Sequence, residues 1–116
     1  MKAAIRTLLL AGQKLWIGTD KGVLAYECQT GKFQQIPHEH LPSQQVLSML
    51  HAGGRIWIGT EGGLASCLPN GSGWRTIRKE DKLVHDVVSA IAADIQYLWV
   101  GSMGGGFTRI SGILKE

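Results

Sequence analysis

A five-residue segment containing a tryptophan occurs three times in the chain, and it limits the possible folds more than any other feature does. Residues 15–19 read Leu-Trp-Ile-Gly-Thr, residues 56–60 read Ile-Trp-Ile-Gly-Thr and residues 98–102 read Leu-Trp-Val-Gly-Ser. The three tryptophans are therefore 41 and 42 residues apart. Self-similarity at a nearly fixed period is the mark of a repeat architecture, so we expect three copies of one structural unit.

Each unit divides into four short segments of alternating polarity, separated by glycine-rich turns that leave no room for a helix of about 10 residues. In the first unit the segments are residues 5–9, 15–19, 23–27 and 32–36. Four short strands in a period of about 40–45 residues are typical of a β-propeller blade, and this period is too long for ankyrin or leucine-rich repeats. The sequence therefore predicts an all-β partial propeller of three four-stranded antiparallel blades.

The whole chain, residues 1–116, is predicted to be a single partial propeller. Blade 1 covers about residues 4–36, blade 2 about residues 45–77 and blade 3 about residues 86–116. The turn at residues 93–95 carries one extra residue, which accounts for the longer second spacing. The final strand, at residues 113–116, is short and terminal.

The repeated tryptophans and glycines are predicted to be structural. A tryptophan can bury on the order of 150–250 Å², and its return at one position of every unit favours packing over stacking on a ligand. The apolar residues on both sides of each tryptophan indicate strands covered on both faces, as in blades sandwiched between neighbours. The predicted structural residues are Trp16, Gly18, Trp57, Gly59, Trp99 and Gly101.

Residues 15–33 carry a longer pattern, Leu-Trp-Ile-Gly-Thr-x-x-Gly-Val-Leu-x-Tyr followed by Thr-Gly-Lys-Phe. This pattern resembles the two-component regulator propeller repeat, which is found in periplasmic sensor regions of bacterial hybrid histidine kinases. The likeness covers nearly the whole chain, is good at residues 56–64 and is weakest in the third unit, where Met103 and glycines replace the usual polar turn residue. The resemblance implies a non-catalytic propeller for binding or sensing, periplasmic if it belongs to such a kinase, and no kinase activity in this chain.

Three blades leave a ring incomplete, because propellers typically have about four to eight. Two blade faces rich in Trp, Leu, Ile and Val would be uncovered, and monomers rarely expose apolar patches above roughly 300–600 Å². Self-association is therefore expected, with a homodimer of six blades as the simplest closed ring and a nine-bladed trimer less favoured. The alternative is that the chain is a piece of a longer protein.

Binding residues are sought in the loops that a propeller gathers on one axial face, by analogy with the architecture. The short turns between second and third strands supply Asp20, Lys21, Glu61 and Met103. The longer connections between blades supply His38, His40, His85 and Asp86. A small molecule or carbohydrate is the expected ligand of these loops.

Composition and motifs narrow the function classes. The net charge of +3 is spread without a basic stripe, so no nucleic-acid partner is expected. The apolar stretch at residues 5–11 contains Arg6 and is too short to span a bilayer, so no membrane segment is expected. Cys28 and Cys67 have neither CxxC spacing nor disulfide density, and two free thiols are expected.

No catalytic residue, cofactor or metal site is predicted. The chain has no nucleophile elbow and no phosphate-binding loop ending in Gly-Lys-Ser/Thr. His38 and His40 flank Glu39, and His85 precedes Asp86, but exposed polar loops are the commoner meaning of such patterns. Two alternatives to a sensor remain open: an assembly scaffold that closes by self-association, and an enzyme of the streptogramin-lyase type.

Overall fold

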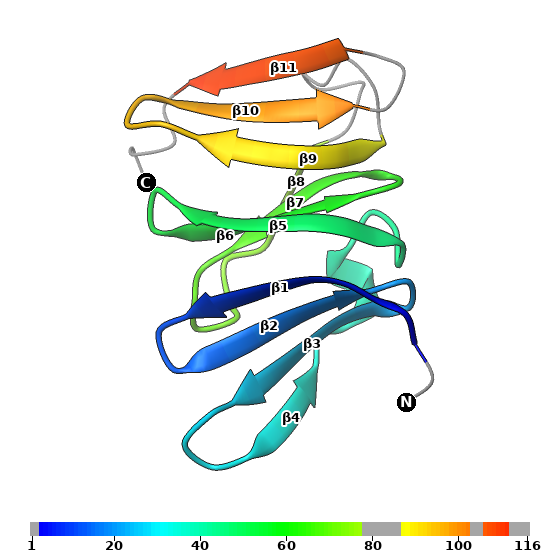
Figure 1. Ribbon diagram of the computed structural model, residues 1–116, viewed down its shortest axis with the longest axis vertical. Coiled ribbons are helices and arrows are strands. Elements are labelled where there is room, and N and C mark those ends of the chain that lie inside the picture. The colour runs from blue at the N-terminus through cyan, green and yellow to red at the C-terminus, as the bar shows by residue number, and fades with distance from the viewer. Residues whose placement is uncertain (1–2, 78–86, 103–105, 112–116) are drawn as a thin grey trace.

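The computed structural model describes residues 3–77, 87–102 and 106–111, and these residues are arranged almost entirely as strands (Figure 1). The first sheet has the strand order β1-β2-β3-β4 and the second has the order β5-β6-β7-β8. The third sheet has the order β11-β10-β9 among the described residues. The strands of the first sheet are β1 (Ile5–Ala11), β2 (Lys14–Thr19), β3 (Gly22–Glu27) and β4 (Lys32–Gln35). Those of the second are β5 (Val46–Ala52), β6 (Arg55–Thr60), β7 (Gly63–Cys67) and β8 (Arg75–Ile77). Those of the third are β9 (Val88–Ala93), β10 (Tyr97–Ser102) and β11 (Gly106–Ser111), and one short 3-10 helix, η1 (His38–His40), joins the first sheet to the second.

The predicted fold class is confirmed: the chain is an all-β partial propeller of antiparallel blades. Every paired strand in each sheet runs antiparallel to its neighbour. The fourth strand expected in blade 3, at residues 113–116, lies outside the described residues. Among the helices of the described residues, none is long and apolar enough to cross a membrane.

Two details that follow from aligning the three units are wrong. The alignment predicts a strand at residues 74–77, but Trp74 precedes β8, which begins at Arg75. It also predicts that Val87 is equivalent to Val46, but the residue opposite Ser102 is Val88. All three blades share the register shift at this point, so the error arises because the extra residue of the third unit lies before its first strand.

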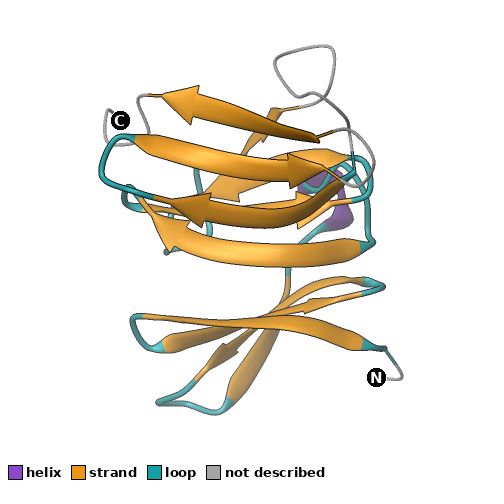
Figure 2. Ribbon diagram, turned by 45° about the horizontal axis from the view of Figure 1, so that its top comes forward, coloured by secondary structure: helices purple, strands orange, loops and turns teal. Residues whose placement is uncertain are grey.

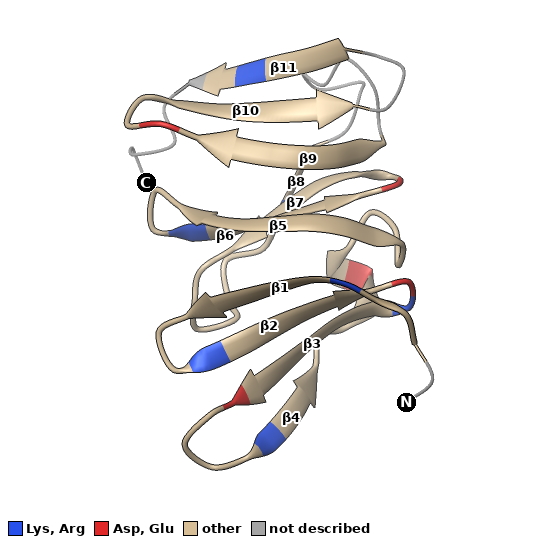
Figure 3. Ribbon diagram, in the orientation of Figure 1, with Lys and Arg blue, Asp and Glu red and all other residues tan. Residues whose placement is uncertain are grey.

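The three blades fan out from their first strands. β5 contacts β1 on one side and β9 on the other, so the first strands of the blades are neighbours. Figure 1 shows β4 and β11, the outer described strands of the end blades, at opposite ends of the long axis, and Figure 2 shows the same stack from a tilted view. Figure 3 shows charged residues mostly toward strand ends and turns, which leaves much of the sheet surface apolar or uncharged.

Two buried clusters hold the blades together. The cluster between blades 1 and 2 places Trp16, with no exposed surface, against residues that include Ile56 and Ile58. The cluster between blades 2 and 3 places Trp57 against residues that include Leu98 and Val100. In both, the tryptophan side of one blade packs on the aliphatic side of the next, which is the packing role predicted for Trp16 and Trp57.

The glycine two residues after each tryptophan allows this packing. A Cβ atom on Gly18 would lie 2.7 Å from Val46 Cγ1, and a Cβ atom on Gly59 would lie 2.6 Å from Val88 Cγ1. Real Cβ atoms essentially never come so close to another heavy atom. A valine at the start of the next blade therefore occupies the space that a side chain at Gly18 or Gly59 would need.

The turn between β9 and β10 does not carry the extra residue that the sequence pattern placed at residues 93–95. Ala92 pairs with Trp99 as Leu50 pairs with Trp57, seven residues apart in both blades, so the extra residue lies before Val88. Asp94 Oδ1 accepts hydrogen bonds from the backbone N–H groups of Gln96 and Tyr97, both at 2.8 Å. Its other carboxylate oxygen accepts a hydrogen bond from Trp99 Nε1 at 3.3 Å. The hydrogen bond from the Gln96 N–H, followed by that from Tyr97, lowers the pKa of the Asp94 carboxyl below its usual value of 3.8. Asp94 thus fixes this turn with its side chain.

Candidate functional site

The turns that carry Lys21 and Glu61 are built identically in blades 1 and 2. Thr19 Oγ1 donates to the Gly22 carbonyl at 2.9 Å and accepts from the Lys21 N–H at 3.0 Å. In blade 2, Thr60 Oγ1 donates to the Gly63 carbonyl at 2.8 Å and accepts from the Gly62 N–H. The buried threonine of each repeat therefore holds its turn in one conformation, and the exposed side chains of Lys21 and Glu61 project from a rigid base.

The connection between blades 1 and 2 packs against both of these turns. His38 Nε2 lies 3.1 Å from the Lys21 carbonyl oxygen and 3.2 Å from the side-chain nitrogen of Gln35. Further along, the Pro42 carbonyl oxygen would lie 2.6 Å from a Cβ atom on Gly62. The turns of two blades and their connection therefore meet in one continuous surface, which we call the turn surface: residues 19–22, 38–43 and 60–63.

The structure brings together some of the predicted binding residues and gives others a structural contact. Lys21, His38 and Glu61 lie exposed on the turn surface. Asp20 Oδ1 accepts a hydrogen bond from the Ala4 N–H at 2.9 Å, and this bond ties the start of the chain to the first turn. His85, Asp86 and Met103 lie outside the described residues.

His40 makes an aromatic contact that the sequence did not indicate. Its ring stacks on Trp74, with ring centroids 4.9 Å apart and planes only 1° from parallel. Trp74 Nε1 donates to the Gly71 carbonyl at 3.0 Å, and the ring also packs against the cluster between blades 1 and 2. The contact joins the connection to the outer part of blade 2. Trp74 interrupts the repeat, and that was the only signal of a special role.

Arg55 is a buried cation that sequence reasoning also missed. Only 3% of its surface is exposed. Its guanidinium donates to Ser66 Oγ at 3.1 Å and to the Gly73 carbonyl. The contacts hold the loop between β7 and β8, in which Trp74 lies, to the start of β6. Lys14 occupies the equivalent place in blade 1, as both residues pair with the last alanine of the preceding strand.

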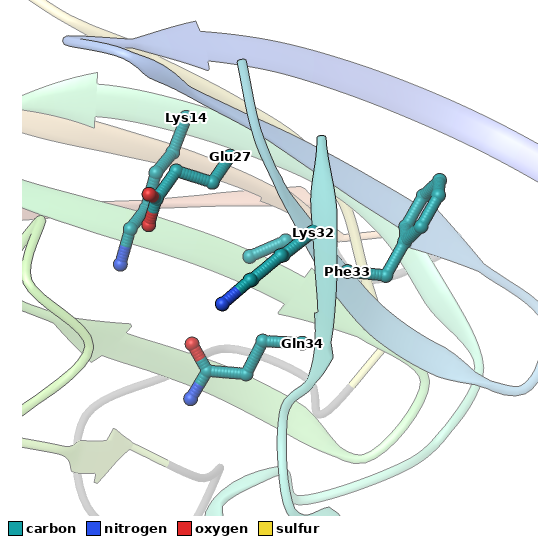
Figure 4. Close-up of a pocket in the computed structure, with 6 residues that line it drawn as sticks. Lys14, Glu27, Lys32, Phe33 and Gln34 are labelled. Carbon is teal, nitrogen blue, oxygen red and sulfur yellow. The ribbon is translucent and has the colours of Figure 1, made fainter. Parts of the chain in front are cut away.

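A second polar surface lies at the other end of blade 1, beside the turns that follow β1 and β3. It is a hollow of about 200 Å³ lined by Lys14, Ala25, Glu27, Lys32, Phe33 and Gln34. Glu27 pairs with Lys14 on β2 and with Lys32 on β4, so alternating charges cross three strands. Figure 4 shows the polar side chains of this hollow on one side of the sheet and the Phe33 ring on the other. The strand register creates this charge row, and the register was not predictable from spacing alone.

The two cysteines are free thiols, as predicted, and their surroundings differ. Cys28 is exposed, whereas Cys67 is fully buried between blades 1 and 2. Burial raises the pKa of the Cys67 thiol to about 12, against the opposing effects of Arg55 and Lys14. In the described part of the chain, no group of three or more His, Cys, Asp or Glu side chains is arranged to hold a metal ion.

We expect the two thiols to react at very different rates. Because the thiolate is the reactive form, Cys67 should resist a maleimide reagent at pH 8 while Cys28 is labelled. Mass spectrometry of the native protein should show one adduct per chain, and two after denaturation. In Cys28→Ser the native protein should remain unlabelled. Rapid double labelling of the native wild type would contradict the burial of Cys67.

Comparisons with known proteins show a likeness in fold. The chain superposes on the extracellular domain assigned to a hybrid two-component system of B. thetaiotaomicron with a TM-score of 0.77 and 22% identity over 95% of the chain. It superposes on an extracellular domain assigned to a one-component system of the same organism with a TM-score of 0.71 and 22% identity over 90% of the chain. The chain spans only 16% of the length of each of these structures.

The same arrangement of strands occurs in a different setting. A chain in a complex of S. cerevisiae Dbp5 with Nup159, Gle1, IP6 and ADP matches 97% of this chain with a TM-score of 0.65 and 9% identity, over 28% of that chain. No protein-family model matches the sequence, and no curated protein matches it. Extracellular domains assigned to two-component and one-component systems are thus among the structural neighbours, and at these identities the likeness is one of fold.

Proposed function

We propose that the chain is part of a non-catalytic sensory β-propeller of the two-component regulator type, and that its turn surface binds a small polar ligand such as a saccharide. The observation that carries this proposal is the convergence of two threonine-locked turns and the connection between blades on one surface. Lys21, His38 and Glu61 present exposed polar groups there, and His40 of the connection stacks on Trp74 of the loop between β7 and β8.

The chemistry of this surface favours recognition over catalysis. The contacts of His38 Nε2 are the Lys21 carbonyl and the Gln35 side-chain amide. General acid or base catalysis by histidine usually depends on a carboxylate that orients the ring, and these partners are neutral. The fold likeness to extracellular domains assigned to two-component and one-component systems is consistent with a sensory role and with a periplasmic location.

A saccharide panel tests the proposal by thermal shift followed by titration calorimetry. A ligand at about 100 times its Kd should stabilise the fold by about 2.7 kcal/mol, which raises Tm measurably. We expect the Kd to weaken at least about tenfold in Lys21→Ala, which removes an exposed donor, and in His38→Ala, which removes the ring that holds the Lys21 turn against the connection.

Lys32→Ala is the matched control, since it removes a cation from the hollow at the other end of blade 1. Its Kd should equal that of the wild type. If Lys32→Ala alone abolished binding, the ligand would belong to that hollow and the turn surface would be the wrong site. If no member of the panel shifted Tm, a saccharide-sensing role would be excluded for the panel used.

A further inference from the structure

The two junctions inside the chain follow one rule. Val46 of blade 2 lies over Gly18 of blade 1, and Val88 of blade 3 lies over Gly59 of blade 2. The two valines are equivalent, because each pairs with the last residue of the second strand in its own sheet. Each junction therefore needs a tryptophan-side face with a bare glycine and an aliphatic face that begins with a β-branched residue.

Blade 3 presents the first half of a third junction. A Cβ atom on Gly101 would meet only Ala90 within 4 Å, at 3.6 Å or more, so the space above this glycine is open among the described residues. Phe107, opposite Gly101 in the sheet, is 66% exposed. Val23 and Leu64 occupy the same position in the other blades and are at most 1% exposed.

The tryptophan of this third face is also only partly covered. Trp99 is half-buried, whereas Trp16 and Trp57 are at most 7% exposed. Beside it lies a shallow apolar hollow of about 390 Å³, whose lining includes Ala90, Trp99, Gly101 and Phe107. Arg109 departs from the pattern of the other blades, but its guanidinium lies 4.3 Å from the centre of the Tyr97 ring. The guanidinium also lies 6.0 Å from the centre of the Trp99 ring, so it covers the part of this face nearest Tyr97, whereas Gly101 lies toward the opposite end of β10.

Blade 1 presents the second half of the junction. Ile5 pairs with Thr19 and so occupies the position of Val46 and Val88. It is 62% exposed, and Leu8 and Leu10 beside it on β1 are 57% and 66% exposed. Met49, which matches Leu8 in register, is buried against blade 1. Blade 1 thus leaves open the aliphatic face that blades 2 and 3 bury.

We propose that a second copy of the chain completes both open faces, with blade 1 of each copy stacked on blade 3 of the other and Ile5 seated over Gly101. Both halves of the contact are present in one chain, and the two internal junctions show how they fit. A head-to-tail contact closes into a ring when its rotation permits. The blades fan from neighbouring first strands with β4 and β11 at opposite ends (Figure 1). Two copies joined in this way would carry six blades, within the range of about four to eight blades that propellers have.

Light scattering coupled to size exclusion measures the mass of the particle. The wild type should have twice the 12.6 kDa mass of one chain. Gly101→Val should be monomeric at the same concentration, with the Kd for self-association weakened at least about 100-fold, because the valine fills the space meant for Ile5. Its circular dichroism should be unchanged, since Gly101 lies clear of the internal junctions.

Gln34→Val is the matched control, because it adds a β-branched side chain at an exposed strand position away from both open faces. It should remain a dimer. A wild type that stays monomeric at 0.5 mM would overturn the proposal, since this concentration is on the order of 10³ times the Kd of a micromolar dimer. In that case we would expect blades of a different chain to cover the two open faces. An unchanged dimer in Gly101→Val would overturn it as well.

Cross-linking distinguishes a closed dimer from an open chain of copies. In a Cys28→Ser background, Ile5→Cys combined with Gly101→Cys should oxidise to a covalent species of two chains. Gly18→Cys combined with Val46→Cys should cross-link within one chain and serve as the positive control, because those residues meet at an internal junction. A ladder of higher multiples, or a three-chain species, would contradict the six-bladed dimer.

Discussion

Replacing Trp16 by alanine should lower the free energy of unfolding by about 3–5 kcal/mol, the range observed when large aromatic side chains are removed from protein cores. The side chain has no exposed surface and is shared between the cores of two blades. Its loss opens a cavity that the sheets can close only by shifting against each other. Urea denaturation followed by tryptophan fluorescence or circular dichroism measures the change as a lower midpoint.

Trp99→Ala is the internal comparison, since the same residue type stands at the same blade position on an open face. In the Gly101→Val background, where we expect separate chains, it should cost less than half as much as Trp16→Ala. Equal costs would show that something other than the next blade covers Trp99.

Trp16→Phe separates packing from polar effects. Trp16 Nε1 has no hydrogen-bond partner among the described residues, whereas Trp57 Nε1 donates to the Ala52 carbonyl at 3.0 Å. Phenylalanine retains much of the apolar surface and removes a buried donor that is costly to leave unsatisfied. We expect Trp16→Phe to cost less than half as much as Trp16→Ala, and Trp57→Phe to cost more than Trp16→Phe because it breaks a hydrogen bond.

The sequence was sufficient for the fold because every local signal is repeated. The repeated tryptophan packs against the sheet of the next blade. The glycine two residues later leaves space for the first residue of that blade, and in blades 1 and 2 the threonine that follows holds the turn through its hydroxyl group. A strand pattern seen once is ambiguous, but three aligned copies fix the strand order. They did not fix every face, because the alignment placed the first strand of blade 3 one residue too early.

The contacts outside the repeat could not be predicted in the same way. The stacking of His40 on Trp74 joins a connection to a residue 34 positions away, and no periodicity links them. Arg55 sits where the repeat has a lysine at residue 14, so its burial depends on the loop that wraps over it. The charge row of Lys14, Glu27 and Lys32 likewise depends on cross-strand register. These features arise from tertiary packing, which local pattern does not encode.

The turn surface was predictable in part. Architecture predicted that the turns and the connection between blades meet, and for blades 1 and 2 the contacts of His38 and Pro42 bring them together. Architecture did not reveal which polar groups would be used internally. The Asp20 carboxylate accepts a hydrogen bond from the Ala4 backbone N–H, and the His38 ring nitrogen contacts the Lys21 carbonyl oxygen. The side chains left exposed, Lys21 and Glu61, are those best able to contact a ligand.

Gly59→Ala should be the most damaging single-methyl change in the molecule, with an expected loss of about 2–3 kcal/mol in unfolding free energy from overpacking. The new Cβ atom would lie 2.5 Å from Ser48 Oγ, 2.6 Å from Val88 Cγ1 and 2.9 Å from the Val88 carbonyl oxygen. The last of these contacts is with backbone, so blades 2 and 3 would have to move apart. Gly101→Ala is the control when both variants are compared as separate chains, below the concentration at which they self-associate. Within one chain its Cβ atom would make only an ordinary contact with Ala90 at 3.6 Å, so it should change the unfolding free energy little. Urea midpoints of the two variants give the comparison, and similar losses for both would contradict the rule that each blade seats its first residue over the glycine of the blade before it.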